Sequence, residues 1–469
     1  MKNTIQPSPD VGDFFSFDDL PEGWECKKLG EIISPSKEKI EPTADSTLPY
    51  IGLEHIESNT SKIIGQAIAS DAKSTKTVFH SGDVLYGKLR PYLNKVAIPD
   101  FDGVCSTDIL VFKQNQIIDS RYLMRYLTTG DVVGYANRKS KGISLPRVSF
   151  ENLSEILIPL PPLDEQQRIV ARVEAILTHV NAARNKLSRV PLIMKKFRQA
   201  VLAAACSGRL TEEWREENPD VECGAELLNK ILKERRVISE DSRFVKNIKR
   251  KYREPLAPSS LDFSIIPDTW QWATFDQITS LITKGSSPSW QGFDYLDTGI
   301  QFVRSQNIQW GNLNLDEIAY LSPKYNEIHQ SSIIRENDIL LNLVGASIGR
   351  STIATKTIDG ANCNQAVGII RLVDEFLSKK FILFYLLSPH SQDYINDTKS
   401  DSARANFNLD DVRPTPVPLP PLAEQYEIVR SVGLLFERAD AFDSEVLAAG
   451  RRCERLTQAV LGKAFSGKL

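Results

Sequence analysis

One short motif matches a known arrangement for nucleophilic catalysis. Gly345-Ala-Ser-Ile-Gly349 fits the pattern GxSxG, which in α/β-hydrolases places a reactive serine between a strand and a helix. The residues from Arg350 onward alternate like a second strand, and His390 is the only histidine that follows. A loop between two strands, presenting backbone amides and Arg350, therefore describes the segment better than a nucleophile at Ser347. A hydrolase that uses Ser347 is kept as an alternative.

Other signatures of catalysis and of metal binding are missing from the sequence. It has neither a GxxxxGKS/T phosphate loop nor a GxGxxG turn, and it lacks the Asn/Asp-Pro-Pro-aromatic loop of aminomethyltransferases. The five histidines and six cysteines are scattered, with no HExxH and no CxxC. We therefore expect a chain that is not an enzyme and that binds no metal and no cofactor of its own.

What remains is a set of basic, amide and aromatic side chains in loops. Such side chains bond the edges of guanine and adenine, and they also grip phosphates. The candidates in the first half are Lys88, Arg90, Asn94, Lys95, Arg138, Lys139 and Lys141. The candidates in the second half are Lys284, Arg304, Gln306, Asn307, Trp310, Arg350, Arg404 and Asn406. Lys88, Arg90 and Arg350 stand out because they lie in comparable loops of a repeat; the alternative is that these loops are merely solvated turns.

The element that must position these loops occurs twice. PLPPLDEQ…SGRL spans residues 159–210, and PLPPLAEQ…SGKL spans residues 418–469, so every position recurs 259 residues later without a gap. An internal repeat of this length determines the architecture. Each copy carries apolar residues at alternating spacings of four and three, which is the pattern of a coiled-coil seam. The seam residues, which we also expect to help dock partners, are Ile169, Val173, Ile176, Val180, Leu187, Ile428, Val432, Leu435, Phe442 and Val446.

Both copies contain a helix-breaking residue at the same place. Pro191 falls inside the first seam, and the matching position of the second copy is Gly450. We therefore expect two helices joined by a kink or a short turn in each copy. Gly208 and Gly467 follow the last periodic residues, as glycines do just beyond the end of a helix. The simplest use of two equal seams is to pack against each other in an antiparallel coiled coil; the alternative is two ordinary core helices.

Each helical segment follows a region of many short strands and a few helices. Leu20-Pro-Glu-Gly-Trp24 opens the first region and Ile266-Pro-Asp-Thr-Trp270 the second, 246 residues later, so the second carries about 13 extra residues. The sequence predicts two globular α/β (α+β) domains, separated by two long helical segments and related by a pseudo-twofold internal repeat. The expected order is a tail (1–19), domain 1 (20–158), helical segment 1 (159–210), a basic linker (211–262), domain 2 (263–417) and helical segment 2 (418–469).

Composition leaves the class of partner open. The formal net charge is −3, so overall charge does not indicate a nucleic-acid binder, although local patches can act alone. Residues 230–253 hold ten basic and three acidic side chains, which suits either a solvated linker or a contact with a phosphate backbone. The sequence contains no apolar run of membrane-spanning length and no signal pattern, so we expect a cytoplasmic protein.

Taken in order, these features resemble the specificity subunit of type I restriction-modification systems. The resemblance is carried by LPEGW, by GDVLYGKLRPYLNKVA at 82–97, by GASIGR at 345–350 and by both PLPPLxEQ…SGxL segments, and it covers nearly the whole chain. It implies that each globular domain reads one half of a split DNA site and that the helical pair docks two methyltransferase subunits, through which restriction (translocase) subunits join. S-adenosylmethionine, ATP and magnesium would then belong to the partners.

Two further expectations concern the DNA site. Residues 163–189 would form about 40 Å of helix, or roughly a dozen base pairs of duplex, so the helical pair can set the spacing between half-sites. The two domains have diverged, so we expect an asymmetric site. A coiled-coil scaffold that does not bind DNA, and a variant member such as the reader of a modification-only system, stay open as alternatives.

Overall fold

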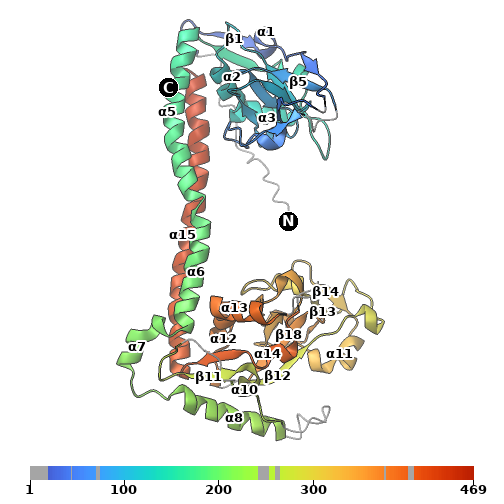
Figure 1. Ribbon diagram of the computed structural model, residues 1–469, viewed down its shortest axis with the longest axis vertical. Coiled ribbons are helices and arrows are strands. Elements are labelled where there is room, and N and C mark those ends of the chain that lie inside the picture. The colour runs from blue at the N-terminus through green and yellow to red at the C-terminus, as the bar shows by residue number, and fades with distance from the viewer. Residues whose placement is uncertain are drawn as a thin grey trace. The chain divides into compact units, whose positions relative to one another are not determined.

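The structure is a computed structural model that describes residues 20–43, 45–69, 74–240, 253–258, 265–373, 376–399 and 406–469. The chain divides into two compact units. Unit 1 comprises residues 1–189 together with 445–469, and unit 2 comprises residues 190–444. Each unit holds a globular domain beside a length of paired helices (Figure 1). No helix in the described parts is long and apolar enough to cross a membrane.

In its described residues, the globular part of unit 1 is built on three small sheets, ordered β2-β5-β8-β3-β4, β7-β6-β9 and β1-β10. The strands are β1 (Glu25–Lys28), β2 (Lys39–Ile40), β3 (Pro49–Ile51), β4 (Ala67–Ile68), β5 (Lys76–Phe79), β6 (Val84–Gly87), β7 (Val96–Ala97), β8 (Gly103–Cys105), β9 (Ile109–Phe112) and β10 (Leu157–Leu160). The helices are α1 (Leu29–Ile32), α2 (Ser120–Leu127), α3 (Gly130–Arg138) and α4 (Phe150–Leu153). Helix α2 contacts both β6 and the long helix α5 (Leu163–Leu187).

Unit 2 repeats this plan with sheets ordered β12-β18-β15-β16, β14-β13-β17 and β11-β19. The strands are β11 (Gln271–Thr274), β12 (Thr279–Lys284), β13 (Ile300–Val303), β14 (Ala319–Leu321), β15 (Ile339–Asn342), β16 (Ser351–Ile353), β17 (Asn362–Cys363), β18 (Val367–Leu372) and β19 (Pro416–Leu419). The helices are α7 (Glu212–Glu217), α8 (Gly224–Glu240), α10 (Phe275–Ile278), α11 (Lys324–Ile328), α12 (Lys379–Leu387), α13 (Pro389–Thr398) and α14 (Leu409–Val412).

Strand pairing confirms the internal repeat and the predicted fold class. Glu25 of β1 pairs with Leu160 of β10, and Gln271 of β11 pairs with Leu419 of β19. The offsets are 246 at the first strand of each pair and 259 at the second, as the sequence predicts. The parallel pairs β3–β8 and β13–β17 also correspond, as do the hairpins β6–β7 and β15–β16.

The long helices are antiparallel, as predicted. In unit 1, Arg184 of α5 reaches Glu454 of α15 (Leu422–Phe465), with a distance of 3.4 Å between Nη2 and Oε1. In unit 2, Arg198 of α6 (Val190–Cys206) reaches Asp440 of the same helix α15. Residue numbers therefore rise along one partner while they fall along the other, and α15 accompanies α5 in unit 1 and α6 in unit 2 (Figure 1).

The expected interruption occurs in the first copy only. Helix α5 ends at Leu187 and α6 begins at Val190, with Pro191 as its second residue. In contrast, α15 continues through Gly450 without a break, so the prediction of a second kink is wrong. The cause is that a proline ring clashes with the carbonyl four residues earlier, here that of Leu187, whereas a glycine costs a helix only about 1 kcal/mol.

A buried glutamine explains why both helical segments begin with the same motif. Gln166 is fully buried; its Oε1 accepts from the backbone N of Asp119 at 2.8 Å, and its Nε2 donates to the carbonyl of Pro161 at 2.9 Å. Gln425 repeats this with the backbone N of Ser378 and the carbonyl of Pro420. Asp119 and Ser378 are the N-cap residues of α2 and α12. The motif therefore fastens the start of each long helix to the globular domain before it.

The ends of the two helical segments also correspond. Gly208 and Gly467 both adopt left-handed backbone conformations, with φ of 78° and 70°. A Cβ atom at Gly208 would lie 2.4 Å from Cγ of Pro267, and one at Gly467 would lie 2.2 Å from Cγ of Pro21. Each SGxL ending thus packs against the proline that opens a globular domain.

The basic linker is only partly covered, because residues 241–252 and 259–262 lie outside the described residues. Its described part includes α8, whose Leu227 and Ile231 are buried in the core of unit 2. Three of its cations have partners there: Lys230 pairs with Glu222, Arg236 pairs with Glu254, and Arg235 donates to the carbonyl of Thr279. The described portion is therefore part of the fold of unit 2.

Candidate nucleic-acid interface

In unit 2, several loops emerge at one end of the central sheets. The segments after β12, β13 and β15 and the turn before β18 meet there. The backbone N of Gly285 donates to the carbonyl of Val367, and the backbone N of Asn364 donates to the carbonyl of Val303. Nδ2 of Asn342 donates to the carbonyl of Ser305 at 2.8 Å, which joins the β15 end to the β13 end. We call these segments, residues 284–291, 304–311, 343–350 and 364–366, the unit 2 loop end.

Most candidates of the second half lie at this loop end. Lys284, Gln306 and Asn406 are exposed, and the Trp310 side chain is 52% exposed. Asn406 forms a β-bridge with Val344, which places it beside the β15–β16 loop. Arg350 is half-buried, and its Nη1 donates to Oε1 of Gln309 at 3.3 Å. The structure therefore gathers cationic, amide and indole groups that are distant in sequence onto one surface.

Two candidates hold the loop together from inside. Asn307 is buried; its Oδ1 accepts from the backbone N of Arg304, and its Nδ2 donates to the carbonyl of Asn314. The Arg304 guanidinium lies 5.7 Å from the ring centroid of Tyr295 and donates to the carbonyl of Glu317. Through these contacts, Asn307 and Arg304 hold the backbone of the segment after β13 in place. Arg404 lies outside the described residues.

Unit 1 has an equivalent loop end. The β6–β7 loop contacts the segment after β3, because Nζ of Lys95 donates to the carbonyl of Leu53 at 2.6 Å. Asn94 is buried, and its Nδ2 donates to the carbonyl of Thr128. Lys88 is half-buried and Arg90 is exposed at the same loop. Lys95, Arg90 and Glu54 line a cavity of about 210 Å³ together with leucines.

The remaining candidates of unit 1 lie at the start of a loop whose later residues the sequence analysis did not single out. Arg138, Lys139 and Lys141 are all exposed, and Nζ of Lys139 lies 5.8 Å from the ring centroid of Tyr135. The loop continues to Arg147, whose Nε donates to Oδ1 of Asp108 at 2.9 Å. That bond and the adjacent charge raise the pKa of the Arg147 guanidinium. We call residues 139–147 the finger loop.

The structure revises which residues of the two hairpin loops are equivalent. Strand pairing aligns Arg350 with Lys95. Arg350 is the residue directly before β16, and Lys95 is the residue directly before β7. The pairing also aligns Arg90 with Gly345 and Asn94 with Gly349, and all four have positive φ, at 51°, 81°, 48° and 83° respectively. The two loops thus share a backbone shape and present different side chains. Arg350 is therefore comparable to Lys95 rather than to Lys88 or Arg90.

Sequence reasoning missed several exposed apolar side chains at these loop ends, of which two are almost wholly exposed. Trp290 follows β12 and is 85% exposed, and Ile143 lies in the finger loop and is 105% exposed. Nothing in the local pattern distinguishes them from core residues, because tryptophan and isoleucine are usually buried. Only the folded structure shows that they point into solvent.

The Ser347 motif does not form a nucleophile elbow. Gly345–Ser347 is a short 3-10 turn between β15 and β16, so the element that follows the serine is a strand and not a helix. His390 packs instead against the rings of Trp272 and Tyr385, with centroid distances of 6.0 and 6.4 Å. The loop-between-strands interpretation is therefore confirmed. The described residues contain no cluster of His, Cys, Asp or Glu suited to hold a metal ion.

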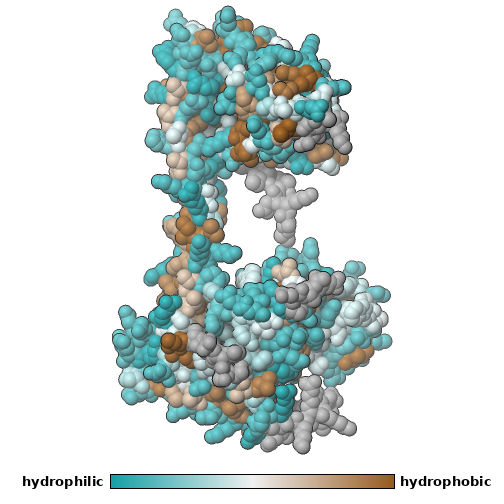
Figure 2. All heavy atoms as spheres, viewed as in Figure 1, coloured by the Kyte–Doolittle hydropathy of each residue, from teal (hydrophilic) through white to brown (hydrophobic). Residues whose placement is uncertain are grey.

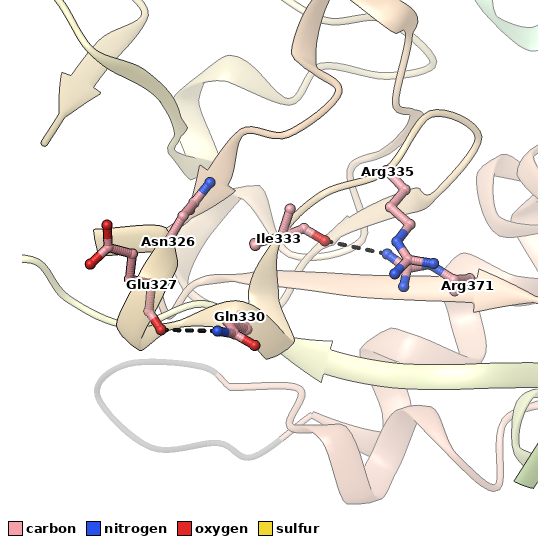
Figure 3. Close-up of a pocket in the computed structure, with 6 residues that line it drawn as sticks. All are labelled: Asn326, Glu327, Gln330, Ile333, Arg335 and Arg371. Carbon is pink, nitrogen blue, oxygen red and sulfur yellow. Dashed lines mark hydrogen bonds between the residues drawn. The ribbon is translucent and has the colours of Figure 1, made fainter. Parts of the chain in front are cut away.

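Unit 2 also contains a cavity of about 450 Å³, whose lining residues are shown in Figure 3. It is lined by Arg335 and Ile333, which precede β15, and by Arg371 of β18. Arg371 donates to both carboxylate oxygens of buried Asp338 at 2.7 Å and to the carbonyl of Ile333. Because Asp338 precedes β15 while the unit 2 loop end follows it, this cavity lies at the opposite end of the strand. Arg371, which is paired with Asp338, stabilises the fold at this end of the strand.

The paired helices expose apolar side chains. On α6, Leu192, Ile193 and Phe197 are 61%, 59% and 38% exposed, and on α15 Phe442 is 47% exposed. Arg198 contacts Asp440 and Asp443, so Phe197 and Phe442 lie at the same level of the pair. Figure 2 shows hydrophobic side chains on the surface of the helices. Phe442 is therefore not enclosed within the seam, whereas Ile428, Val432 and Val173 are buried. The other expected seam residues, which are half-buried, are Ile169, Ile176, Val180, Leu187, Leu435 and Val446.

Comparison with known sequences finds the same arrangement twice in this chain. The family model for the type I restriction modification DNA specificity domain matches residues 21–189 and again residues 268–436. The specificity subunit of the type I restriction enzyme EcoBI from Escherichia coli is 31% identical over 369 residues, covering 78% of this chain and 68% of that protein. The EcoDI specificity subunit from Escherichia coli is 35% identical over 222 residues, covering 46% of this chain and 50% of that protein.

Two solved structures share the fold. A chain from a structure of the type I R-M system, described for its complex assembly and conformational transition, gives a TM-score of 0.68 at 24% identity and covers 96% of this chain and 99% of its own. The HsdS subunit from Thermoanaerobacter tengcongensis gives a TM-score of 0.52 at 24% identity, with coverage of 96% and 98%.

Proposed function

The chain belongs to the family of type I restriction-modification DNA specificity subunits, and we propose that its two loop ends read the two halves of a split DNA site. As a member it is the non-catalytic subunit that recognises DNA, and catalysis lies in the other subunits of the complex. The unit 1 loops would read one half-site and the unit 2 loops the other. The direct readers we assign are Arg90, Lys95, Gln306, Trp310 and Arg350.

One observation carries the proposal that the site is asymmetric. The β6–β7 and β15–β16 loops have the same backbone shape, with positive φ at matching positions, yet they present Arg90 and Lys95 in one unit and Gly345 and Arg350 in the other. One scaffold with two sets of side chains would bind two different base sequences, because hydrogen bonds to base edges determine specificity. Two equal readers would instead favour a palindrome.

The helical pair sets the spacing between the half-sites in this proposal. Helix α5 contains 25 residues, which corresponds to about 38 Å of helix and roughly 11 base pairs of duplex. That length is close to one helical turn, so two readers held apart by it would meet the same side of the DNA. Buried Gln166 and Gln425 fasten the helix starts to the globular domains and would make the spacing reproducible.

The exposed apolar side chains of the helices support docking of the modification subunits. Leu192, Ile193, Phe197 and Phe442 form an apolar surface of a kind that usually marks a protein interface. We propose that two methyltransferase subunits bind along the helical pair, one for each half of the pseudo-twofold repeat, and that restriction subunits join through them. S-adenosylmethionine, ATP and magnesium would then be bound by those partners and not by this chain.

Co-purification with mapping of methylated bases tests the function. The chain is expressed with the methyltransferase encoded beside it, the mass of the complex is measured, and methylated adenines are located in the DNA of a host that carries both. We expect one copy of this chain with two methyltransferase subunits and a split, asymmetric methylated motif. A lone chain that leaves the DNA unmodified would contradict the proposal and favour a scaffold that does not bind DNA.

A further inference from the structure

The finger loop places an apolar side chain fully in solvent beside the reading loops of unit 1. Ile143 is 105% exposed at its tip, and Leu145 is 45% exposed nearby. Leaving an isoleucine in water forgoes the free energy that its burial would release. An isoleucine in this position therefore suits a contact made when the protein is bound to something else.

The base of the finger loop is held firmly. Lys141 and Arg147 exchange two backbone hydrogen bonds of 2.9 Å, and the backbone N of Arg90 donates to the carbonyl of Pro146 at 2.7 Å. The Arg147 side chain is clamped by Asp108 through two bonds of 2.9 and 3.4 Å. These bonds tie the loop to the β6–β7 loop. Ile143 is thus presented on a supported projection, which reduces the entropy lost on binding.

The charge around the tip indicates the partner. Arg90, Arg138, Lys139 and Lys141 are all exposed near the finger loop. Of the acidic groups nearby, Asp108 is paired with Arg147, and exposed Glu54 lines a cavity with Arg90 and Leu145. A wholly exposed apolar residue among cations fits DNA, where cations bind phosphates while isoleucine and similar side chains insert between base steps.

We propose that Ile143 inserts between two adjacent base pairs of the half-site read by unit 1 and unstacks that step. The inference rests on the proposed function, which it deepens by naming a residue that acts through DNA deformation. Pyrimidine–purine steps are the easiest to unstack. The finger loop would therefore favour such a step at one position without a hydrogen bond to either base.

The test uses the complex of the full chain with its methyltransferase partner and a duplex carrying the methylated site. 2-Aminopurine replaces single adenines, and pyrrolo-cytosine replaces single cytosines, across the first half-site. Emission from such bases rises when they unstack. We expect a rise at one step with the unchanged chain, loss of that rise in Ile143→Ala, and its return in Ile143→Met. Binding by Ile143→Ala should weaken on the order of tenfold or more, because the buried apolar contact is lost.

Two further variants separate insertion from other effects. Ile117→Ala removes another isoleucine of unit 1, 50% exposed next to α2, and should leave both affinity and emission unchanged. Lys141→Ala should reduce the salt dependence of DNA binding by the amount expected for the loss of about one phosphate contact, while the emission change persists. An affinity loss in Ile143→Ala without any base-specific emission change in the unchanged chain would overturn insertion, and so would an Ile143→Ala complex that behaves like the unchanged one. A failure of the proposed function differs from these results, because the unchanged complex would then not bind or methylate a split site.

Discussion

Trp270 and Glu424 join the start of the second globular domain to the start of the last helix. Nε1 of Trp270 donates to Oε2 of Glu424 at 2.8 Å, and Glu424 has no exposed surface. The other carboxylate oxygen accepts from Oγ1 of Thr211 at 2.7 Å and from Nη1 of Arg215. One buried carboxylate thus unites the residues just after the first helical segment, the opening of the second domain and the first turn of α15.

Replacing Glu424 with glutamine should therefore destabilise unit 2. The neutral amide would leave the largely buried guanidinium of Arg215 without its anion. We therefore expect the free energy of unfolding to fall by about 2–4 kcal/mol. Urea unfolding followed by circular dichroism measures this. Glu165→Gln, at the equivalent and half-buried position of the first copy, is the matched control and should change stability by less than about 0.5 kcal/mol. Equal effects of the two substitutions would contradict this account.

Gly450 should tolerate alanine and reject proline. A Cβ atom added there meets no atom within 4 Å, and the residue lies within the continuous helix α15. Gly450→Ala should stabilise the chain by up to about 1 kcal/mol, and Gly450→Pro should cost about 3 kcal/mol or more. Thermal unfolding distinguishes them. Gly467→Ala is the contrasting control, because its new Cβ would lie 2.2 Å from Cγ of Pro21, and it should destabilise.

Lengthening the helical pair should lengthen the spacer between half-sites. A heptad inserted after Ala182 in α5 needs a matching heptad after Arg455 in α15, because Arg184 and Glu454 show that these levels face each other. Seven residues add about 10 Å, or roughly three base pairs. Methylated-site mapping should then show the same half-sites with a spacer longer by roughly three base pairs. An unchanged spacer would refute the role of the helices in setting it.

Arg350→Ala should relax discrimination at one position of the second half-site. The guanidinium is held by Gln309 at the loop end, where it can bond a guanine edge, and one such contact is worth about 1–3 kcal/mol of discrimination. Binding to duplexes substituted at each position measures the loss. Arg335→Ala removes an exposed arginine that precedes β15, away from the loop end, and should leave specificity unchanged. A uniform loss of affinity at all positions would make Arg350 a phosphate contact instead.

The cysteines should differ widely in reactivity. Burial raises the pKa of the Cys206 and Cys363 thiols to about 12. At pH 8 only about one thiol in ten thousand would then be ionised, and thiolate is the reactive form. Cys26 is exposed and Cys223 is half-buried, so these two should label first with a thiol reagent. Mass spectrometry of the native chain locates the labels. Labelling of Cys206 at the rate of Cys26 would contradict the buried environment.

Much of the architecture could be predicted because it follows from local periodicity and from repetition in the sequence. The 259-residue offset, the four-three spacing of apolar residues and the SGxL endings are properties of the chain itself, and they predicted two related domains and an antiparallel helical pair. The same holds for the loop between strands at Gly345–Gly349, where alternation after the motif ruled out a helix. The domain boundaries and the candidate DNA contacts stay predictions.

Only the tertiary structure decided which polar loop residues face outward. Asn94 and Asn307 are of a residue type that often contacts bases, yet both are buried and donate to backbone carbonyls. Ile143 and Trp290 are of types usually found in the core, yet both are exposed. The equivalence of Arg350 with Lys95 also emerged only from the pairing of strands in the folded structure. The reason is physical: repeats and helical periods are set by neighbours along the chain, whereas burial depends on residues that folding brings from far away.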